Sequence, residues 1–407
     1  MSMKKLVKKI VATALVGAMA LTAAVGLTSC KKDDADSNVV KIGFSGPLTG
    51  DAAVYGIAVR NSAQLAVDEI NALEASLGDE GLGIRFELMF TDDKHNADLV
   101  ANNYANLYEN GMQISLGTVT TGPGLEFKEL AKEDNVFVLT PSASGDAIPE
   151  YDNAYQMCFA DSNQGTASAN YFNANYAGKT VGVFFKSDDE YSVGIKNKFL
   201  ESLDSSFTVK QASFMGEDSN FASQVQELKA CDVIFMPIYY TPASQFMRQA
   251  KNDVKDNAIY FGCDGLDGIG SIPGFDINSI TQEVSFLTHF DSANATGAAA
   301  DFVAKYNETY DEAKEPLNQF GASAYDCVYA IYEALKFAKA NGVEFDANTS
   351  ASEFCEILKA VFNNDNFVFH GITGAPEANG LSNITWNANG TVDKAAEKSV
   401  VKECTAQ

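Results

Sequence analysis

The sequence predicts an α/β protein with two lobes, each built on a parallel β-sheet that is covered by helices. From Val39 onward, short apolar runs alternate with stretches of helical periodicity, and parallel strands need crossovers of that length. The alternation runs to Leu139 and restarts at Gln164, which favours two sheets over one. The 407 residues leave room for two ordinary domains.

The individual elements follow from apolar periodicity. Ala63, Ala66, Val67 and Ile70, for example, lie on one face of a helix. In the first run we expect strands at 39–45, 84–91, 113–116 and 136–139, and helices at 58–71, 97–109 and 124–134. In the second run we expect strands at 180–185, 207–213, 233–237, 259–262 and 284–288, and helices at 164–176, 194–203, 221–228 and 243–252. Later helices at 298–310, 322–341 and 352–362 have few strands beside them and are expected to complete the first lobe, before short strands at 371–374, 384–386 and 399–401.

The first thirty residues have the pattern of a secretory signal peptide. Four lysines within the first nine positions precede an apolar run at 10–27, and the chain turns polar after Cys30. A membrane anchor is the alternative, because the run reaches the minimal spanning length, but its many Ala, Gly and Thr residues make it weakly hydrophobic. The string Leu-Thr-Ser-Cys resembles the bacterial lipobox, in which the signal is cut before a cysteine that carries lipid. We therefore expect a signal peptide at 1–29, lipid on Cys30 and a tether at 30–38.

The charge balance excludes nucleic acid as a partner. The chain has 54 Asp plus Glu against 29 Lys plus Arg, a net charge of −25. The signal peptide holds four lysines and no acids, so the mature charge is −25 − 4 = −29. Binding of a polyanion needs clustered Lys and Arg, which this chain lacks.

Enzyme and metal signatures are missing from the sequence. His95, His289 and His370 are scattered, and no zinc spacing of cysteines occurs. There is no P-loop, dinucleotide fingerprint, nucleophile elbow or His-Glu-x-x-His motif. We expect no enzyme, no cofactor and no metal, although carboxylate pairs distant in sequence stay open. Six cysteines besides Cys30 lie mostly in apolar surroundings, which favours buried thiols over a disulfide framework.

Two loops after neighbouring strands are rich in small hydroxyl residues. They are Gly-Thr-Val-Thr-Thr-Gly-Pro-Gly at 117–124 and Thr-Pro-Ser-Ala-Ser-Gly at 140–145. Ligands bind at the carboxyl ends of strands in an open α/β sheet, and a helix N-terminus there suits a carboxylate. Helix capping and tight turns would explain either loop alone. Two such loops in succession favour a binding site.

Ten short motifs occur in order along the mature chain. They are S-G-P-L-T-G (45–50), Y-G (55–56), A-V-D-E-I-N-A (66–72), D-D (92–93), L-G-T-V-T-T (116–121), T-P-S-A-S (140–144), D-S-N-Q-G (161–165), D-E-Y-S-V-G (189–194), R-Q-A (248–250) and G-C-D-G (262–265). Together they resemble the branched-chain amino-acid (Leu/Ile/Val)-binding proteins of ABC importers, which are type I periplasmic binding proteins. The resemblance covers essentially all of the mature chain.

This resemblance implies two Rossmann-like lobes joined by a three-segment hinge. The N-terminal lobe would comprise residues 39–160 plus 288–365, and the C-terminal lobe residues 161–287 plus 366–407. The lobes of the family close on a ligand between them.

The resemblance also implies a set of ligand contacts. The family's carboxylate-binding hydroxyl corresponds to Thr121, and the next loop would contact the ligand carboxylate and amine. In the second lobe a tyrosine closes over the ligand, a second aromatic residue precedes a helix, and an acid pairs with the ammonium. The implied residues are Tyr55 for the side-chain pocket, Thr121, Ser142, Ala143 and Ser144 for the α-carboxylate and amine, and Tyr191, Tyr239 and Asp264 from the second lobe.

The sequence departs from the family pattern at three places. Asp264 is one methylene shorter than the usual glutamate, and a turn aspartate that bonds its own backbone is the alternative interpretation. Pro237 and Ile238 replace small glycines beside Tyr239. A loop disulfide is absent, since Asn96 and Thr120 stand near the places of its cysteines.

The expected function is that of a lipid-anchored, extracytoplasmic receptor that delivers an amino acid to an ABC permease in the membrane. The amino acid would be branched-chain or a related apolar one. Two alternatives stay open: a receptor for a small amide or an amine-free aromatic or aliphatic carboxylate, and a sensory ligand-binding ectodomain. The absence of a cytoplasmic domain favours delivery over signalling.

Overall fold

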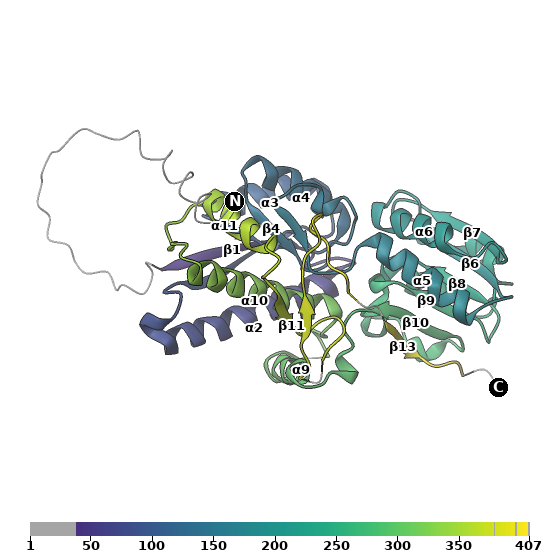
Figure 1. The fold of residues 1–407 in the computed structure, drawn as a ribbon. Helices are drawn as coiled ribbons and strands as arrows, with labels where there is room; N and C mark the ends of the chain where they lie inside the picture. The colour runs from purple at the N-terminus through teal and green to yellow at the C-terminus, as the bar shows by residue number, and fades with distance from the viewer. Residues whose placement is uncertain (1–37, 312, 378, 395–396, 406–407) are drawn as a thin grey trace, which may run out of the picture.

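Two β-sheets with helices on both faces form two lobes that lie side by side (Figure 1). The computed structural model describes residues 38–311, 313–377, 379–394 and 397–405. The signal peptide, Cys30 and nearly all of the tether therefore lie outside the described residues. The α/β class with two parallel-sheet lobes, predicted from alternating periodicity, is confirmed.

The first lobe has a five-stranded sheet in the order β2-β1-β3-β4-β5, with every pairing parallel. Apolar side chains alternate between its two faces: Val138 meets the cluster of Val100, Leu107 and Phe127, while Leu139 meets the core around α10. Both faces are therefore buried, as parallel sheets require. The strands are β1 (Val39–Gly46), β2 (Arg85–Asp92), β3 (Ile114–Ser115), β4 (Phe137–Thr140) and β5 (Ala154–Gln156). The helices are α2 (Ala53–Leu77), α3 (Val100–Glu109), α4 (Thr121–Glu133), α9 (Ala298–Thr309), α10 (Gln319–Ala340) and α11 (Ala351–Phe362).

The second lobe has a six-stranded sheet in the order β13-β10-β9-β8-β6-β7. Only the pairing of β13 with β10 is antiparallel. Phe172 and Phe199 pack on one face, and Phe246 packs against Phe184 on the other. The strands are β6 (Thr180–Lys186), β7 (Thr208–Phe214), β8 (Val233–Met236), β9 (Ile259–Gly262), β10 (Glu283–Thr288) and β13 (Glu397–Lys402). The helices are α5 (Asp161–Asn175), α6 (Glu190–Ser202), α7 (Ala222–Leu228) and α8 (Tyr240–Ala250).

The chain passes between the lobes three times. It crosses after β5 and again after β10, and it returns to the second sheet in β13. The hairpin of β11 (Phe369–Gly371) and β12 (Ser382–Ile384) precedes this last passage. Figure 1 shows the yellow C-terminal segment running from the first lobe to the second.

Residues between the hairpin and Val392 pack on the first lobe. The carboxylate of Asp326 in α10 accepts hydrogen bonds from the backbone N–H groups of Ile372 and Thr373, at 2.8 and 3.0 Å. The indole of Trp386 donates to the carbonyl of Gln156, at 2.9 Å. We therefore propose that the first lobe extends to about residue 392, beyond the expected boundary at residue 365.

Several element bounds differ from the expected ones. Helix α2 is 25 residues long because it packs along α10, where Tyr332 donates to Glu74 at 2.7 Å. Strand β5 was not expected, and the hairpin strands lie two residues earlier than predicted. The six described cysteines are free and five of them are buried, as expected.

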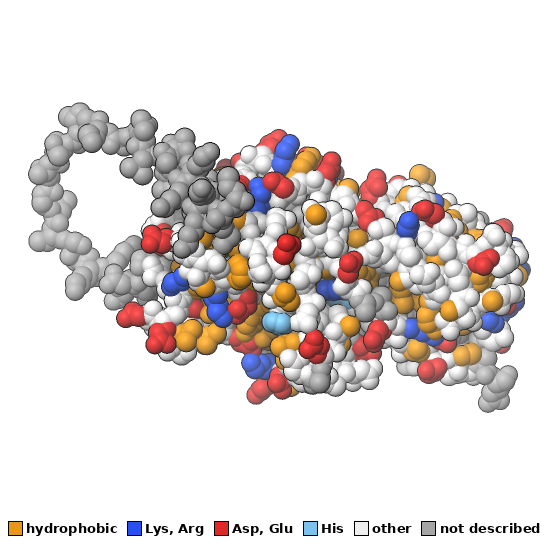
Figure 2. Space-filling view, viewed as in Figure 1, with side chains coloured by type: hydrophobic (Ala, Val, Ile, Leu, Met, Phe, Trp, Pro, Cys, Tyr) orange, Lys and Arg blue, Asp and Glu red, His pale blue; other side chains and the backbone are white. Residues whose placement is uncertain are grey.

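The surface is acidic over both lobes. Figure 2 shows Asp and Glu side chains spread across the visible face, with Lys and Arg interspersed among them. Some ion pairs formed within the described residues join two exposed side chains, such as Lys198 and Glu201, whereas others use a largely buried lysine, such as Lys128 with Glu150. None of the described helices has the length and apolar character needed to cross a membrane.

Candidate functional site

The carboxyl ends of strands from both sheets meet at one place between the lobes. From the first lobe come the segments after β2, β3 and β4, and from the second lobe those after β6, β8 and β9. Tyr55 in α2 donates a hydrogen bond of 2.5 Å to the carbonyl of Gly265 in the second lobe. Thr241 donates to the carbonyl of Asp51, at 2.9 Å, so the lobes are in contact.

The two hydroxyl-rich loops of the first lobe are bonded to each other. Thr121 begins α4, and its Oγ1 accepts from the backbone N–H of Gly145 at 3.1 Å. Ser142 donates to the carbonyl of Val119 at 2.7 Å. Ala143 is fully buried, and its N–H donates to Oγ1 of Thr140 at 3.1 Å. These contacts fix the loops, and Oγ1 of Thr121 still has its own hydrogen to donate.

Tyr191 and Asp264 form a hydrogen-bonded pair in the second lobe. The hydroxyl of Tyr191 donates to Oδ1 of Asp264 at 2.6 Å and accepts from the N–H of Gly265 at 2.9 Å. A Cβ on Gly265 would lie 2.6 Å from that hydroxyl, so only glycine fits. The ring of Tyr239 stacks on Tyr191, with centroids 4.6 Å apart, and lies 6.0 Å from Tyr55.

Two buried carboxylates in this region lack a counter-charge. Asp264 is 1% exposed and Asp161 is 2% exposed, yet neither forms an ion pair in the described part of the chain. Oδ2 of Asp264 and Oδ1 of Asp161 have no hydrogen-bond partner among the described residues, and neither does the hydroxyl of Tyr239. Burial raises the pKa of Asp264 to about 7 and holds the pKa of Asp161 well above its usual range. An uncompensated buried charge is costly, so this region favours a bound cation.

Ser144 joins this acidic region to the first lobe. Its carbonyl accepts from the N–H of Asp161 at 2.9 Å, and its hydroxyl lowers the pKa of the Asp161 carboxyl, against the larger effect of burial. The loops of the first lobe and the acids of the second therefore belong to one continuous set of contacts. The structure brings together all eight residues implied by the sequence: Tyr55, Thr121, Ser142, Ala143, Ser144, Tyr191, Tyr239 and Asp264.

His95 belongs to the same region, although sequence reasoning gave it no role. It follows β2, has φ of +60° and packs edge-on against Tyr239 with centroids 4.8 Å apart. Its Nδ1 lies 2.9 Å from Oγ1 of Thr120, so this contact links two loops near the places where some family members have a disulfide. Burial lowers the pKa of His95 to about 4, with Lys186 adding to the effect, and the ring is neutral at pH 7.

Asp161, Gln164 and Asp189 are three further residues of the site that had no predicted role. Gln164 is fully buried, and its Oε1 accepts from the N–H of Asp264 at 3.2 Å. Asp189 caps α6 by accepting from the N–H of Ser192 at 3.0 Å, and burial raises its pKa to about 6. All three lie in the family motifs at 161–165 and 189–194, so these motifs could have identified them as candidate site residues.

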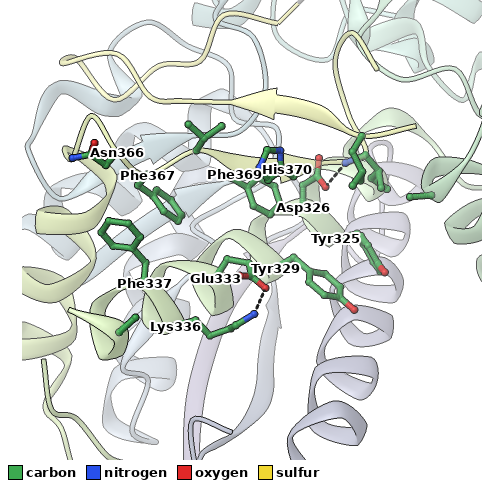
Figure 3. Close-up of a pocket in the computed structure, with 15 residues that line it drawn as sticks. Tyr325, Asp326, Tyr329, Glu333, Lys336, Phe337, Asn366, Phe367, Phe369 and His370 are labelled. Carbon is green, nitrogen blue, oxygen red and sulfur yellow. Dashed lines mark hydrogen bonds and ion pairs between the residues drawn. The ribbon is translucent and has the colours of Figure 1, made fainter. Parts of the chain in front are cut away.

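A cavity of 720 Å³ lies elsewhere, beside α10 (Figure 3). Its walls include Phe337, Phe367 and Phe369. The hydroxyls of Tyr325 and Tyr329 turn to Glu69, at 2.6 and 2.8 Å, and Lys336 pairs with Glu333 at 2.9 Å. Since its charged groups Asp326, Glu333 and Lys336 already have partners, this cavity lacks the uncompensated carboxylates found between the lobes. Across the described residues, no cluster of His, Cys, Asp and Glu could hold a metal ion.

The comparison with family models decides the family. Residues 39–364 match the model described as "Periplasmic binding protein". The chain belongs to the periplasmic binding protein family. Such proteins bind solutes outside the cytoplasm and are not enzymes, so the expectations of an extracytoplasmic location and of binding without catalysis are confirmed.

Relatives and solved structures agree with this membership. The binding protein is 26% identical over 363 residues to "Leu/Ile/Val-binding protein BraC3" of Rhizobium johnstonii, covering 86% of this chain and 92% of the relative. It is similar to the branched-chain amino acid transporter substrate binding protein LivJ of Streptococcus pneumoniae in complex with isoleucine, with 26% identity, a TM-score of 0.69, and coverage of 89% and 99%. A solute binding protein of an ABC transporter from R. palustris, in complex with benzoate, shares the fold at 18% identity, with a TM-score of 0.72 and coverage of 90% and 94%.

Proposed function

We propose that this protein captures an amino acid, branched-chain or related apolar, between its lobes and delivers it to an ABC permease. The observation that carries the proposal is the pair of buried carboxylates, Asp264 and Asp161, each with an unpaired oxygen. The relatives named for leucine, isoleucine and valine support the same ligand class.

The ammonium group of an amino acid fits the acidic end of the site. It has three N–H donors, and three unpaired acceptors lie in this region: Oδ2 of Asp264, Oδ1 of Asp161 and the hydroxyl oxygen of Tyr239. A cation also removes the cost of ionising Asp264, whose pKa burial raises to about 7. Asp264 therefore acts as a ligand contact rather than as a turn residue that bonds its own backbone.

The carboxylate group fits the hydroxyl-rich end. Thr121 is the first residue of α4, so the unpaired N–H groups and partial positive charge of that helix lie beside it. Its hydroxyl accepts from Gly145 and is free to donate to the ligand. The hydroxyl of Ser142 donates its hydrogen to the carbonyl of Val119. Ser142 would therefore contact the ligand through the lone pairs of its hydroxyl oxygen or through its backbone.

The ligand side chain would lie against aromatic rings. Tyr55, Tyr239 and the neutral ring of His95 lie next to one another. Their faces suit an aliphatic chain and offer no charge to a second acidic or basic group. Tyr55 also contacts Tyr240 of the second lobe and Phe320 of the first, with centroids 4.7 and 4.9 Å apart, so neighbours from both lobes hold its ring.

An amine-free carboxylate is the second candidate, because a structural neighbour holds benzoate. Such an anion would place a third negative group beside Asp264 and Asp161, with no cation in return. We therefore favour the amino acid. A sensory role would need a partner that reads the closed state, and nothing in the described residues points to one.

Delivery requires that the receptor stay near its permease. We propose that lipid on Cys30 anchors the mature chain to the bacterial cell membrane, with 30–38 as a short hydrated tether. The lipobox-like string and the polar residues after it support this anchor. The lipid would let one receptor meet the permease repeatedly without diffusing away.

The ligand class is tested with matched pairs of compounds. L-leucine, L-isoleucine and L-alanine are titrated calorimetrically, each beside the acid that lacks its amine, such as 4-methylpentanoate for leucine. We expect at least one amino acid to bind, and its deaminated partner to bind more weakly by roughly 2–5 kcal/mol, about thirty-fold to several-thousand-fold. Equal or tighter binding of the deaminated acids or of benzoate would reject the amino-acid proposal.

A further inference from the structure

The N-terminus of α10 receives hydrogen bonds from both lobes. Its first backbone N–H groups lack partners within the helix, as in any α-helix, and carry a partial positive charge. Asn318, which belongs to the same lobe, caps the N–H of Gly321 at 3.0 Å. Asp267 lies in the second lobe, just beyond β9, and its Oδ2 accepts from the N–H of Gln319 at 2.9 Å.

Asp267 also bonds the side chain of the same residue. Its Oδ2 lies 3.2 Å from Nε2 of Gln319, so one carboxylate oxygen accepts two hydrogen bonds from the first residue of the helix. The side-chain oxygen of Gln319, Oε1, accepts from the N–H of His289 at 3.2 Å, in the second passage between the lobes. Gln319 is 1% exposed, so this contact is formed away from bulk water.

This arrangement depends on the relative position of the lobes. Helix α10 packs on α2 and on the first sheet, whereas Asp267 moves with the second sheet. Separation of the lobes would break the bonds between Asp267 and Gln319, while the bond from Asn318 to Gly321 would stay. The same helix therefore has one permanent cap and one cap that exists only in the closed arrangement.

We propose that Asp267 is a positioning residue that latches the closed state by capping α10 across the lobe boundary. It acts on the lobes and makes no contact with the ligand: its carboxylate turns to Gln319, whereas that of Asp264 turns to Tyr191. Its effect on ligand affinity rests on the proposed function, but its effect on lobe separation does not.

The test measures lobe separation with and without a ligand. Cysteines that carry spin labels replace the exposed Glu126 in α4 and Glu201 in α6, in the mature chain with Cys30→Ser and Cys404→Ser, and the interspin distance is read by pulsed electron resonance. Asp267→Asn keeps the size of the side chain and removes the charge, and Asp267→Ala removes the cap. Asn318→Ala is the matched control, because it removes the cap that the first lobe supplies to the same helix.

We expect Asp267→Ala to move the ligand-free population toward longer distances, with the closed fraction relative to the open one falling about three- to thirty-fold. Asp267→Asn, whose amide oxygen can still accept both hydrogen bonds from Gln319, should keep the closed population. Asn318→Ala should lower the unfolding midpoint and leave the distances unchanged. Gln319→Met, which removes Nε2 and keeps the helix, should shift the population in the same direction, and its effect should not add to that of Asp267→Ala.

Ligand kinetics give a second readout. With the amino acid that binds best to the wild type, Asp267→Ala should release it faster by a similar factor, at an unchanged association rate. Unchanged distances in Asp267→Ala, or a lowered unfolding midpoint of that variant without any change in distance, would overturn the proposal. If no amino acid binds the wild type, the proposed function fails, and the ligand-free distances still decide the role of Asp267.

Discussion

Replacing Asp264 with asparagine should weaken ligand binding and strengthen the ligand-free fold. Asparagine keeps the shape of the side chain, and its oxygen still accepts from Tyr191, which donates to Asp264 at 2.6 Å. What disappears is the negative charge, which no ion pair compensates within the described residues. Ligand affinity and unfolding free energy should therefore move in opposite directions.

The two magnitudes follow from the burial of Asp264, which is 1% exposed. Removing one partner of a desolvated ion pair costs roughly 2–5 kcal/mol, so the dissociation constant of an amino acid should rise about thirty-fold or more. In the ligand-free protein, burial raises the pKa from 3.8 to about 7. A raised pKa means that ionising Asp264 in the folded protein lowers the free energy of unfolding. This destabilisation is absent below about pH 4, where the group is protonated in both states, and reaches its full size above about pH 7. Removing the charge should then add up to about 4 kcal/mol to the unfolding free energy at pH 8.

Calorimetric titration at pH 8 gives the affinity, and urea unfolding of the ligand-free protein gives the stability. Asp276→Asn is the matched control, since Asp276 is an exposed cap of its own turn and accepts from Asn278 at 3.0 Å. That variant should change neither quantity appreciably. A loss of affinity below about threefold for Asp264→Asn would refute the role of Asp264 as the ammonium partner. A loss of stability at pH 8 would refute the claim that its charge is uncompensated.

Three further predictions follow from the same residues. Thr121→Val keeps the shape and removes the hydroxyl, so calorimetry should show a loss of about 1.5–3 kcal/mol in ligand binding with little change in melting temperature; equal affinity would mean that Thr121 only joins the loops. The affinity for an amino acid should fall as pH drops through about 7, about thirty-fold between pH 8.5 and 5.5, because Asp264 must lose its proton to pair with an ammonium; a flat wild-type profile would contradict this. Cys30→Ala should release the full-length protein from the membrane fraction of expressing cells. Unchanged fractionation would contradict the proposal that Cys30 carries a lipid anchor.

Much of the fold was predictable because parallel sheets in this chain are buried on both faces. In the second lobe, strands β6, β8, β9 and β10 are short apolar runs, which the sequence shows without knowledge of the strands that pair with them. Strand β5 is different: Ala154–Gln156 is three residues long and becomes a strand only because β4 pairs with it. The β11–β12 hairpin is positioned by the carboxylate of Asp326 in α10, which accepts hydrogen bonds from the chain just after β11. The sequence of the hairpin alone therefore does not indicate which lobe it joins.

The site was predictable wherever a loop follows a strand in the sequence. That rule found the hydroxyl-rich loops, and the family motifs added the tyrosines and Asp264. It gave no role to His95 or Asp161, because their part depends on contacts across the lobes: His95 with Tyr239, and Asp161 with Ser144. Such contacts join residues far apart in the chain, and neither the hydrophobic periodicity nor the positions of strand ends predict them.

The position of β13 has a consequence for how the protein is made. Residues between 369 and 392 pack on the first lobe, and β13, which ends at Lys402, pairs with β10 at the edge of the second sheet. The first lobe lacks part of its core, including Phe369, Ile384 and Val392, until those residues have left the ribosome, since synthesis runs from the N-terminus. The second sheet likewise lacks its edge strand until β13 has been made. A chain that cannot finish folding early stays suited to passage through a narrow export channel. Deletion of β13 should leave the second lobe with an open sheet edge at β10.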